Sequence, residues 1–406
     1  MAFNGENRAH NGRGKLTIIA PTPPYPPLSG GAAHILRMTE QLARFYRITF
    51  AALAPDPAAV EWGPLARVCE AMLTFRRTPR AGWSGNPPAV TQEFSAEFAA
   101  YAQAAWRADP PDIVQIEFTS LAQYARAARA AGALVVCTAH NVAFLAQIRR
   151  ARQERALARR ARRWLGALSL WRYELATLPQ CHLVIAHNQA DAAALRRWLP
   201  RLPIEYVPSG IDLGDWPVCF DPLRENEVLF VGNYLHPPNI EGALWLAREV
   251  WPRVRRQRPA ARLMLAGRDP PPAIRALAAP DIRVPGALAD LRPLYARSSL
   301  FAAPIFWGSG VRIKLLEALA CGLPVVTTAL AAEGIDLHDG ASALFAERPD
   351  AFADAILRLL DDAALRARLG AAGRAIVERD YDADRIGARL AGLYERHDWL
   401  RQGAAR

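Results

Sequence analysis

The chain contains almost no lysine. It has 50 basic residues, and only Lys15 and Lys314 are lysines; all of the others are arginines. Cysteine is also scarce, and the five cysteines are scattered without paired spacing, which argues against a disulfide framework and a zinc site. No apolar run approaches the roughly 18 residues of a membrane-spanning helix, and the polar N-terminus lacks the apolar core of a signal peptide. We therefore expect a cytoplasmic protein.

Length and composition indicate a globular protein with more than one core. A chain of 406 residues exceeds an ordinary single domain, and its residues are 51% hydrophobic and 22% charged. The formal net charge of +11 makes nucleic acid, anionic lipid and phosphorylated ligands the partners to consider. Charge alone does not choose among them.

Buried strands alternate with helical stretches along the chain, which is typical of parallel α/β sheets. The segment VPSGIDLGDWP, residues 207–217, divides the strands into two sets. The first set is 15–20, 47–53, 112–118, 133–139 and 183–188, and the second is 227–232, 261–267, 281–286, 299–304, 323–328 and 342–347. The sequence therefore predicts two doubly wound α/β domains facing a central cleft.

Glycine and histidine stand where predicted strands end. In open α/β sheets, ligands bind beyond the carboxyl ends of the strands, often against the start of a helix. Gly30 and Gly31 open a helix after the first strand, so their backbone N–H groups can approach an anion; a plain tight turn is the alternative. His140 follows the strand ALVVCTA, where it could bond a ligand or transfer a proton, or act only structurally.

The loop after the strand EVLFVG is a third such position. Gly232 and Asn233 begin this loop, and a helix is expected to start near Asn239. Asn239 is a plausible N-cap, and capping alone would explain it.

The stretch GSGVRIKLLEA, which contains Lys314, is the fourth position. Its glycines follow the strand SLFAAP, and the helix they open is expected to carry Gly310, Lys314 and Glu317 on one face. A helix N-terminus with an amine suits a diphosphate, and a carboxylate one turn further suits ribose hydroxyls. The alternative is an exposed Lys–Glu pair, which does not explain why arginine is avoided here.

These residues carry a resemblance to a known family. The segments VLFVGNYLHPPNIEGALWL, ARLMLAG, GSGVRIKLLEALACGLPVV, TTALAAEGI and LRARLGAAGRAIVERDYD, together with PPLSGGAAHIL, TAHN and VPSGIDL earlier in the chain, occur in the family's order. The chain resembles the retaining glycosyltransferases of family 4, which have the GT-B fold. The resemblance implies an acceptor-side domain over 15–206, a linker over 207–224, a nucleotide-sugar domain over 225–383, and a C-terminal helix within 384–400 that crosses back onto the first domain.

The resemblance also implies the roles of single residues. Glu317 corresponds to the second Glu of the family's Glu, seven residues, Glu motif and is expected to contact the donor ribose, but Ser309 stands where the first Glu would be. The Arg and Lys that many members place after the first strand of this domain are missing, so we expect Lys314, aided by Arg312 or Arg268, to bind the diphosphate. The residues predicted to form the site are His140, Lys314 and Glu317 as catalytic groups, and Gly30, Gly31, Gly232, Asn233, Arg268, Ser309, Gly310 and Arg312 as donor-binding groups.

The implied reaction is sugar transfer with retention, in which the leaving diphosphate helps to deprotonate the acceptor hydroxyl. The implied partners are a nucleotide diphosphate sugar and a glycan or lipid-linked acceptor. No carboxylate cluster demands a metal, so we expect no metal and no other cofactor. Base recognition, donor sugar and acceptor are not specified by the sequence.

An arginine-rich segment, QIRRARQERALARRARRW at 147–164, holds eight arginines and is predicted to continue as one helix to Trp171. Its stripe Leu157, Ala161, Trp164, Leu168 and Trp171 either packs beneath a solvated basic face or docks on anionic lipid at the inner face of the membrane.

Three other functions are open to such a chain. A nucleic-acid-binding protein would explain the charge, but the sequence has no zinc finger, RNP motif or basic patch interleaved with aromatics, so we expect no nucleic acid. A catalytically silent GT-B protein that binds glycans or partner proteins would explain Ser309. A nucleotide-sugar epimerase on the same fold would not produce VPSGIDL and the C-terminal segments in this order.

Overall fold

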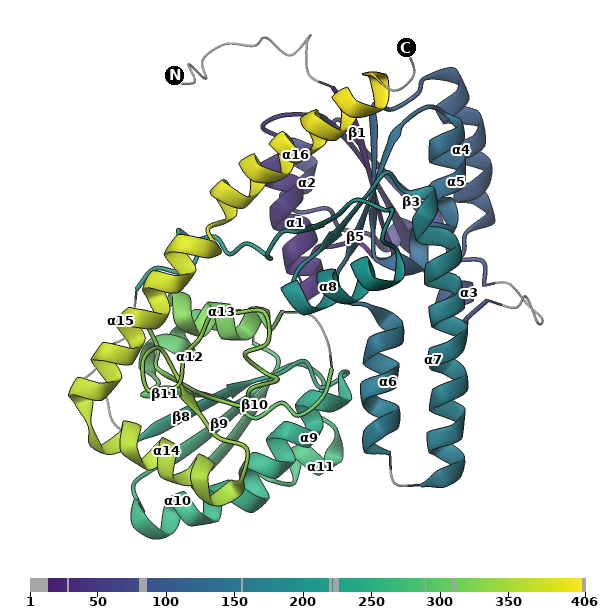
Figure 1. Cartoon of the computed structure of the whole chain (residues 1–406). Coiled ribbons are helices and arrows are strands. Elements are labelled where there is room, and N and C mark those ends of the chain that lie inside the picture. The colour runs from purple at the N-terminus through teal and green to yellow at the C-terminus, as the bar shows by residue number, and fades with distance from the viewer. Residues whose placement is uncertain are drawn as a thin grey trace. The chain divides into compact units, whose positions relative to one another are not determined.

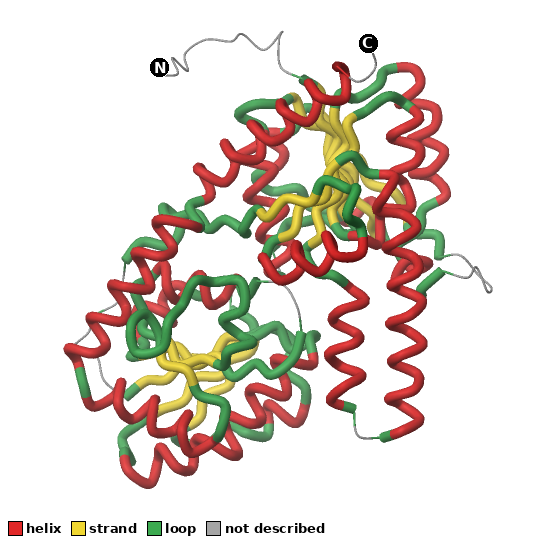
Figure 2. Tube along the Cα trace, in the orientation of Figure 1, coloured by secondary structure: helices red, strands yellow, loops and turns green. Residues whose placement is uncertain are grey.

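The structure is a computed structural model, which describes residues 14–403 except 28, 80–85, 155, 219–220, 222–225, 289 and 309–310; of 153 and 398–403 it gives the backbone alone. The chain forms two compact units. Unit 1 runs to Val207 and includes the chain from Asp384 onward, and unit 2 runs from Pro208 to Ala383. In each unit the strands form a central layer between helices (Figures 1 and 2).

Unit 1 is built on a parallel sheet with the strand order β3-β2-β1-β4-β5-β6-β7. Its strands are β1 (Lys15–Ala20), β2 (Arg47–Ala54), β3 (Ala71–Arg76), β4 (Ile113–Glu117), β5 (Leu134–Ala139), β6 (Leu183–Ala186) and β7 (Ile204–Tyr206). The central strands are apolar on both faces because helices cover both sides, as β5 shows with every residue buried. The two edge strands β3 and β7 were not predicted, since one is only half-buried along its length and the other has three residues.

The helices of unit 1 connect these strands. They are α1 (Gly30–Leu42), α2 (Leu65–Val68), α3 (Pro88–Gln92), α4 (Ala96–Ala108), α5 (Ala125–Ala130), α6 (Ala143–Gln153), α7 (Leu157–Thr177), α8 (Gln189–Trp198) and α16 (Ala383–Gly403). Ser29 caps α1, its hydroxyl accepting a hydrogen bond from the N–H of Ala32 at 3.2 Å. This cap sets the start of α1 at the end of the loop that leaves the carboxyl end of β1.

The last helix, α16, lies against unit 1. Tyr394 is fully buried and donates a hydrogen bond from its hydroxyl to the side-chain oxygen of Gln115 on β4, at 2.8 Å. Arg389 bonds the carbonyl of Tyr206 at 2.7 Å, and Tyr46 contacts the carbonyl of Ala391 at 3.4 Å. The end of the chain is therefore part of the first unit's core.

Unit 2 contains a second parallel sheet with the order β10-β9-β8-β11-β12-β13. Its strands are β8 (Glu227–Val231), β9 (Arg262–Ala266), β10 (Ile282–Gly286), β11 (Leu300–Ala303), β12 (Val325–Thr327) and β13 (Leu344–Phe345). Each lies within a segment predicted as a strand. The predicted fold class, two doubly wound parallel α/β sheets, is thus confirmed.

Helices on both faces of this sheet complete unit 2. They are α9 (Pro237–Trp245), α10 (Trp251–Gln257), α11 (Pro272–Arg275), α12 (Arg292–Arg297), α13 (Ile313–Ala320), α14 (Pro349–Asp361) and α15 (Ala363–Asp380), with a π-helical turn over Leu246–Val250. The core is apolar and continuous, and it includes Trp251, Tyr295 and Phe352 from three of these helices.

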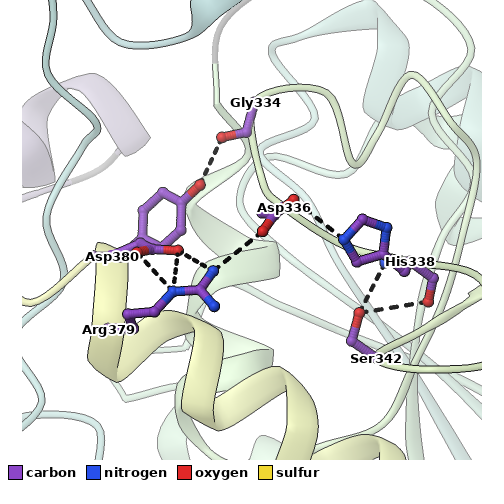
Figure 3. Close-up of polar contacts among 7 residues, drawn as sticks. Gly334, Asp336, His338, Ser342, Arg379 and Asp380 are labelled. Carbon is purple, nitrogen blue, oxygen red and sulfur yellow. Dashed lines mark hydrogen bonds and ion pairs between the residues drawn. The ribbon is translucent and has the colours of Figure 1, made fainter.

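The loop after β12 is tied to the end of α15 by polar contacts (Figure 3). The guanidinium of Arg379 reaches Asp336 at 3.1 Å and Asp380 at 2.6 Å, and the hydroxyl of Tyr381 donates to the carbonyl of Gly334 at 2.7 Å. The carbonyl of Tyr381 also accepts a hydrogen bond from the N–H of Ile211 at 2.7 Å. Tyr381 therefore holds the first residues of unit 2 as well. These contacts hold the loop that starts at the carboxyl end of β12.

The arginine-rich segment forms two helices, so the prediction of one helix from 147 to 171 is wrong. α6 ends at Gln153 and α7 begins at Leu157, and the two lie side by side as an antiparallel pair (Figure 1). Glu154 takes an extended conformation between them and pairs with Arg159 at 3.3 Å and Arg163 at 3.2 Å. Among the described residues, no helix is long and apolar enough to cross a bilayer.

Candidate functional site

Both sheets have a switch point, where strand order reverses and loops diverge to opposite faces. It lies between β1 and β4 in unit 1, and between β8 and β11 in unit 2. Ligands of open α/β sheets bind at such points, beyond the carboxyl ends of the strands. The predicted site residues that the structure describes gather at these two places, except His140, which follows the neighbouring strand β5, and Arg268, which follows β9.

Lys314 is the centre of the unit 2 cluster. Its ammonium donates a hydrogen bond to the side-chain oxygen of Asn239 at 2.5 Å and lies 4.7 Å from the centroid of the Phe230 ring. Asn239 in turn donates to the carbonyl of Asn233 at 2.7 Å. The amine on α13 is thus held across the switch point by the first turn of α9, the helix after β8, and it is not a freely exposed surface lysine.

The environment of Lys314 disfavours its charge. Burial and then the nearby charge of Arg312 lower the pKa of Lys314 to about 7, although Glu317 opposes the shift. Burial and the charge of Lys314 also lower the pKa of His236. In the part of the chain that the structure describes, the amine bonds the neutral amide of Asn239, and a bound diphosphate would supply a charged partner.

Glu317 stands one turn further along α13. One of its carboxylate oxygens accepts a hydrogen bond from the hydroxyl of Tyr295 at 3.0 Å. Tyr295 is fully buried, and its burial, followed by the charge of Glu317, raises the pKa of the tyrosine. The tyrosine therefore stays protonated and holds the carboxylate in a fixed orientation.

α13 begins later than predicted. Its first residue is Ile313, and Arg312 is the extended N-cap residue, so Arg312 precedes the helix that carries Lys314. Arg312 lies close enough to Lys314 to lower its pKa, which adds a second positive charge to the cluster. Ser309 and Gly310 lie outside the described residues.

Glycines after β8 and β9 permit a close approach of these two strand ends. A Cβ on Gly232 would lie 3.0 Å from the Cβ of Asn239, and one on Gly267, which has φ +150°, would lie 1.7 Å from the carbonyl oxygen of Gly232. Asn233 accepts at its side chain from the N–H of Leu235 at 3.0 Å. Packing therefore accounts for Gly232, whose backbone still lines the switch point.

Two further predictions concern residues that follow β8 and β9 at the carboxyl edge of the unit 2 sheet. Arg268 follows β9 and pairs with Asp269 at 2.7 Å, so its charge is partly neutralised by its neighbour. The predicted N-cap Asn239 is wrong, because α9 begins at Pro237 with His236 as its N-cap residue. The side chain of Asn239 is instead used to bond Lys314.

His140 is the centre of the unit 1 cluster. Its Nε2 lies 2.6 Å from a carboxylate oxygen of Glu117, and its ring stacks on Phe118 with the centroids 4.1 Å apart. A Cβ on Gly31 would lie 2.9 Å from the Phe118 ring and 3.9 Å from Nδ1 of His140. The structure therefore brings together Gly31 and His140, two predicted residues from separate strand ends. Gly30 is the exposed first residue of α1 beside them.

Two more histidines complete this cluster. The rings of His34 and His187 lie 5.3 Å and 5.1 Å from that of His140, edge to face. Burial lowers the pKa of His34 and lowers that of His187 to about 3, so both are neutral. His187 bonds the carbonyl of Val207 at 2.8 Å.

The loop after His140 is held from α7. The buried carboxylate of Glu174 accepts hydrogen bonds from the N–H groups of Ala143 at 3.2 Å and Phe144 at 3.4 Å, which open α6. Burial raises the pKa of Glu174 to about 7, although these bonds oppose the shift. In the described part of the chain, no three His, Cys, Asp or Glu side chains gather as metal ligands would.

Sequence reasoning missed Glu117, Phe118, His34 and His187. Phe118 has φ 71°, a conformation that costs a non-glycine residue energy and that often marks a functional site. One signal for Glu117 was present: it is the last residue but one of the predicted strand 112–118, close to the strand's carboxyl end. The strand order that makes the two strands neighbours was not visible in the sequence.

Comparison with solved structures gives the class of fold, which is GT-B. The structure aligns with sucrose-phosphate synthase from Thermosynechococcus elongatus with a TM-score of 0.73, at 20% identity over 95% of this chain and 99% of that one. It aligns with HepE of Anabaena, determined with UDP and glucose, with a TM-score of 0.69 at 17% identity over 94% of this chain and 100% of that one. Likenesses at this identity show the fold.

Sequence comparison then gives the family. Residues 28–215 match the profile described as Glycosyltransferase Family 4, and residues 225–362 match Glycosyl transferases group 1. The chain belongs to glycosyltransferase family 4, a family of retaining enzymes, as its motifs predicted.

Curated relatives match over a shorter range. An uncharacterized 44.6 kDa protein in the cps region of Klebsiella pneumoniae is 25% identical over 214 residues, 50% of this chain and 53% of that protein. Phosphatidyl-myo-inositol mannosyltransferase of Mycobacterium tuberculosis is 28% identical over 204 residues, 47% of this chain and 53% of that enzyme. The chain spans about half the length of these relatives.

Proposed function

We propose that the protein transfers a sugar, with retention, from a nucleotide diphosphate sugar to a hydroxyl group of a glycan or lipid-linked acceptor. The observation that carries the proposal is the cluster around Lys314. An ammonium with a depressed pKa, a second cation at Arg312 and the N-terminus of α13 converge where a diphosphate would bind. Glu317, fixed by Tyr295, supplies acceptor oxygens for ribose hydroxyls.

The reaction needs no enzyme nucleophile. The bond between the anomeric carbon and the phosphate oxygen breaks, the acceptor oxygen bonds the same carbon from the same face, and the acceptor proton passes to the leaving diphosphate. The charges of Lys314 and Arg312 stabilise the leaving group, and Arg268 adds charge from the neighbouring strand. His140 orients a sugar hydroxyl near the reacting centre, and the Gly30–Gly31 turn lets backbone approach the ligand.

Similar proteins suggest which donors to test first. HepE was determined with UDP-glucose, and a relative from Corynebacterium glutamicum, 33% identical over 99 residues, is described as GDP-mannose-dependent. The relative in a cps region favours a role in polysaccharide biosynthesis. We therefore rank UDP and GDP sugars ahead of ADP sugars.

Calorimetric titration with UDP, GDP and ADP tests the donor site, and an assay with the matching sugar nucleotide and a candidate acceptor tests transfer. Binding of one nucleotide together with formation of a product that keeps the anomeric configuration of the donor supports the proposal. Binding without transfer would favour the alternative function, a catalytically silent GT-B protein, which would explain Ser309 in place of the first motif Glu. Binding of none would overturn the donor site.

The lowered pKa of Lys314 predicts how donor binding depends on pH. Free Lys314 titrates near pH 7, and a bound diphosphate favours its charged form, so binding takes up a proton above pH 7. We expect the affinity for a nucleotide sugar to be nearly constant just below pH 7. Above it the affinity should fall by up to about tenfold per pH unit, the limit for one proton.

The measurement is titration in two buffers of different ionisation enthalpy at pH 8, which counts the protons taken up. A nucleotide sugar is used because its phosphodiester linkages avoid the terminal phosphate that titrates near pH 6. The Lys314→Met variant is the control and should take up none. Equal proton uptake by both proteins would contradict the role of Lys314.

We also propose that α7 contacts an anionic lipid surface. Four residues of its predicted packed stripe are exposed, Leu157, Ala161, Trp164 and Leu168, and Leu165 beside them is 69% exposed. Exposed arginines flank this stripe, and long apolar side chains next to arginine suit the interface of a negatively charged bilayer. The alternative of a stripe packed beneath a solvated face does not fit this exposure.

Sedimentation with phosphatidylglycerol vesicles tests this contact. At low salt we expect the protein to pellet with anionic vesicles and not with neutral ones, and added salt should weaken the binding because it screens the arginines. The double variant Leu165→Glu/Leu168→Glu should lose most of the binding.

The matched control is Val218→Glu, which alters a residue 60% exposed in unit 2 and should leave binding unchanged. Pelleting without vesicles that disappears in the double variant would instead indicate association between copies of the chain. Absence of pelleting with anionic vesicles would remove the membrane contact.

A further inference from the structure

A chain of buried hydrogen bonds runs from the last helix to His140. Tyr394 on α16 donates to the side-chain oxygen of Gln115 at 2.8 Å. The side-chain nitrogen of Gln115 donates to one oxygen of Glu117, and the other oxygen of Glu117 meets Nε2 of His140 at 2.6 Å. Tyr394, Gln115 and Glu117 are at most 3% exposed, so water does not compete for these bonds.

These hydrogen bonds run in one direction, which selects the tautomer of the His140 imidazole. The hydroxyl of Tyr394 donates to the amide oxygen of Gln115, which turns the amide nitrogen toward Glu117. Both carboxylate oxygens of Glu117 then act as acceptors, so Nε2 of His140 carries the hydrogen. A neutral His140 consequently has its lone pair on Nδ1, the nitrogen that lies toward Gly31.

The surroundings leave His140 as the group that can meet a ligand. His34 and His187 are both buried, and their atoms Nδ1 and Nε2, respectively, have no hydrogen-bond partner in the described part of the chain. They pack edge-on against His140 and restrict the rotation of its ring, and Phe118 covers one face. The ring is thus held from three sides, with Nδ1 on the side of the glycine turn.

We propose that Glu117 is a positioning residue, which holds His140 in the Nε2–H tautomer so that Nδ1 accepts a hydrogen bond from a substrate hydroxyl, and that Gln115 and Tyr394 hold Glu117 in turn. The inference rests on the proposed function, because the hydroxyl belongs to the transferred sugar or to the acceptor. The C-terminal helix therefore contributes to the site through Tyr394.

The test is the Glu117→Gln variant of the full chain. Gln115 still donates to the oxygen of the new side chain, so the new amide turns its N–H groups toward Nε2 of His140. Nε2 must then accept a hydrogen bond, so the imidazole hydrogen moves to Nδ1. The substrate hydroxyl then meets an N–H donor at Nδ1 in place of the acceptor that it needs. We expect turnover to fall roughly 10²- to 10⁴-fold, the range for a misplaced proton-transfer group, while calorimetric affinity for the nucleotide is unchanged.

Long-range ¹H–¹⁵N spectra of histidine-labelled protein read the tautomer directly, and His140→Ala identifies the His140 signals. Wild type should show the Nε2–H form and Glu117→Gln the Nδ1–H form. Glu117→Asp keeps a carboxylate, so it should keep the Nε2–H form and recover part of the turnover. This variant also keeps the inference testable if Glu117→Gln fails to fold.

Two tyrosine variants test the end of the hydrogen-bond series that is farthest from His140. Tyr394→Phe removes the hydroxyl that orients Gln115, and it should lower turnover several-fold without altering nucleotide affinity. Tyr46→Phe is the matched control, because the hydroxyl of Tyr46 also contacts α16, at the carbonyl of Ala391. Equal losses in the two variants would contradict a role for Tyr394.

The spectra separate this inference from the proposed function. If wild type transfers no sugar from any donor, the proposed function fails, and the tautomer in Glu117→Gln still decides the role of Glu117. An unchanged tautomer in that variant overturns the inference, even if turnover falls. Reversal of the tautomer together with loss of turnover at unchanged nucleotide affinity supports both.

Discussion

Replacing Lys314 with alanine is expected to weaken nucleotide diphosphate binding by roughly 1.5 to 3 kcal/mol, which is about 10- to 150-fold in the dissociation constant. The reason is that the ammonium is positioned by Asn239 and Phe230 before the ligand arrives, and a charge-assisted hydrogen bond made in a desolvated site is stronger than one in water. Calorimetric titration with the nucleotide that wild type binds measures the loss.

The chain offers a matched control for this variant, since it has one other lysine. Lys15 forms an ion pair with Asp109 whose two side chains are both exposed, and such pairs contribute little. Lys15→Ala should therefore leave nucleotide affinity unchanged. Equal affinities of wild type and Lys314→Ala would mean that Lys314 does not contact the diphosphate.

Lys314→Arg separates charge from shape. The guanidinium is a broad planar fork, whereas the ammonium is a compact point charge. In the structure the ammonium occupies the space between Asn239 and the Phe230 ring. We expect Lys314→Arg to recover only part of the affinity lost in Lys314→Ala. Full recovery would show that any cation suffices and that the rarity of lysine in the chain has no bearing on this position.

The same variants should reveal a conflict between binding and stability. Because the folded-state pKa of Lys314 lies below its ordinary value of 10.5, the folded protein disfavours the ammonium, and this cost grows as pH falls from 10.5 toward about 7. Lys314→Met removes the charge and keeps an unbranched side chain. We expect the variant to melt at a higher temperature than wild type at pH 7 without ligand, although it binds nucleotide less well.

The sequence predicted the strands of this fold well because parallel strands buried on both faces are continuous apolar runs. It also directed attention to His140, Lys314 and Glu317, because the carboxyl end of a strand and the start of the next helix can be located from the same runs. These are local properties of the chain. The roles of His140, Lys314 and Glu317 in binding and catalysis remain predictions.

The contacts between strand ends could not be predicted in the same way. Glu117 and His140 meet because β4 and β5 are neighbours in the sheet, and strand order is set by the packing of the whole unit. The bond from Asn239 to Lys314 likewise joins residues separated by 75 positions, across the switch point. Helical patterns gave no indication of either pair.

Helix ends were the other source of error. The break between α6 and α7 falls in a run of Arg, Ala, Gln and Glu, all good helix formers, with no Gly or Pro to mark it. The extended conformation of Glu154 is favoured by tertiary contacts and by its own pairing with Arg159 and Arg163. A break of this kind has no sequence signature, and it is what turns one predicted helix into an antiparallel pair.

Replacing His140 with alanine is expected to lower turnover by roughly 10²-fold or more, the lower range for groups that handle protons or orient a reacting hydroxyl. Nucleotide affinity should change far less, because the nucleotide contacts predicted from the cluster around Lys314 lie in unit 2 and His140 belongs to unit 1. Steady-state rates at saturating donor, compared with calorimetric affinity for the nucleotide, separate the two effects.

A second histidine of the same sheet shows what a purely structural role would look like. Nδ1 of His182 accepts the backbone N–H of Val135 at 2.9 Å, and His182 precedes β6 at the amino edge of the sheet, opposite to the edge where His140 lies. His182→Ala should lower the melting temperature and leave turnover per folded molecule unchanged. If His140→Ala behaved like His182→Ala, the histidine that follows β5 would be structural, and the reacting hydroxyl would have to be oriented by another group beside the Gly30–Gly31 turn.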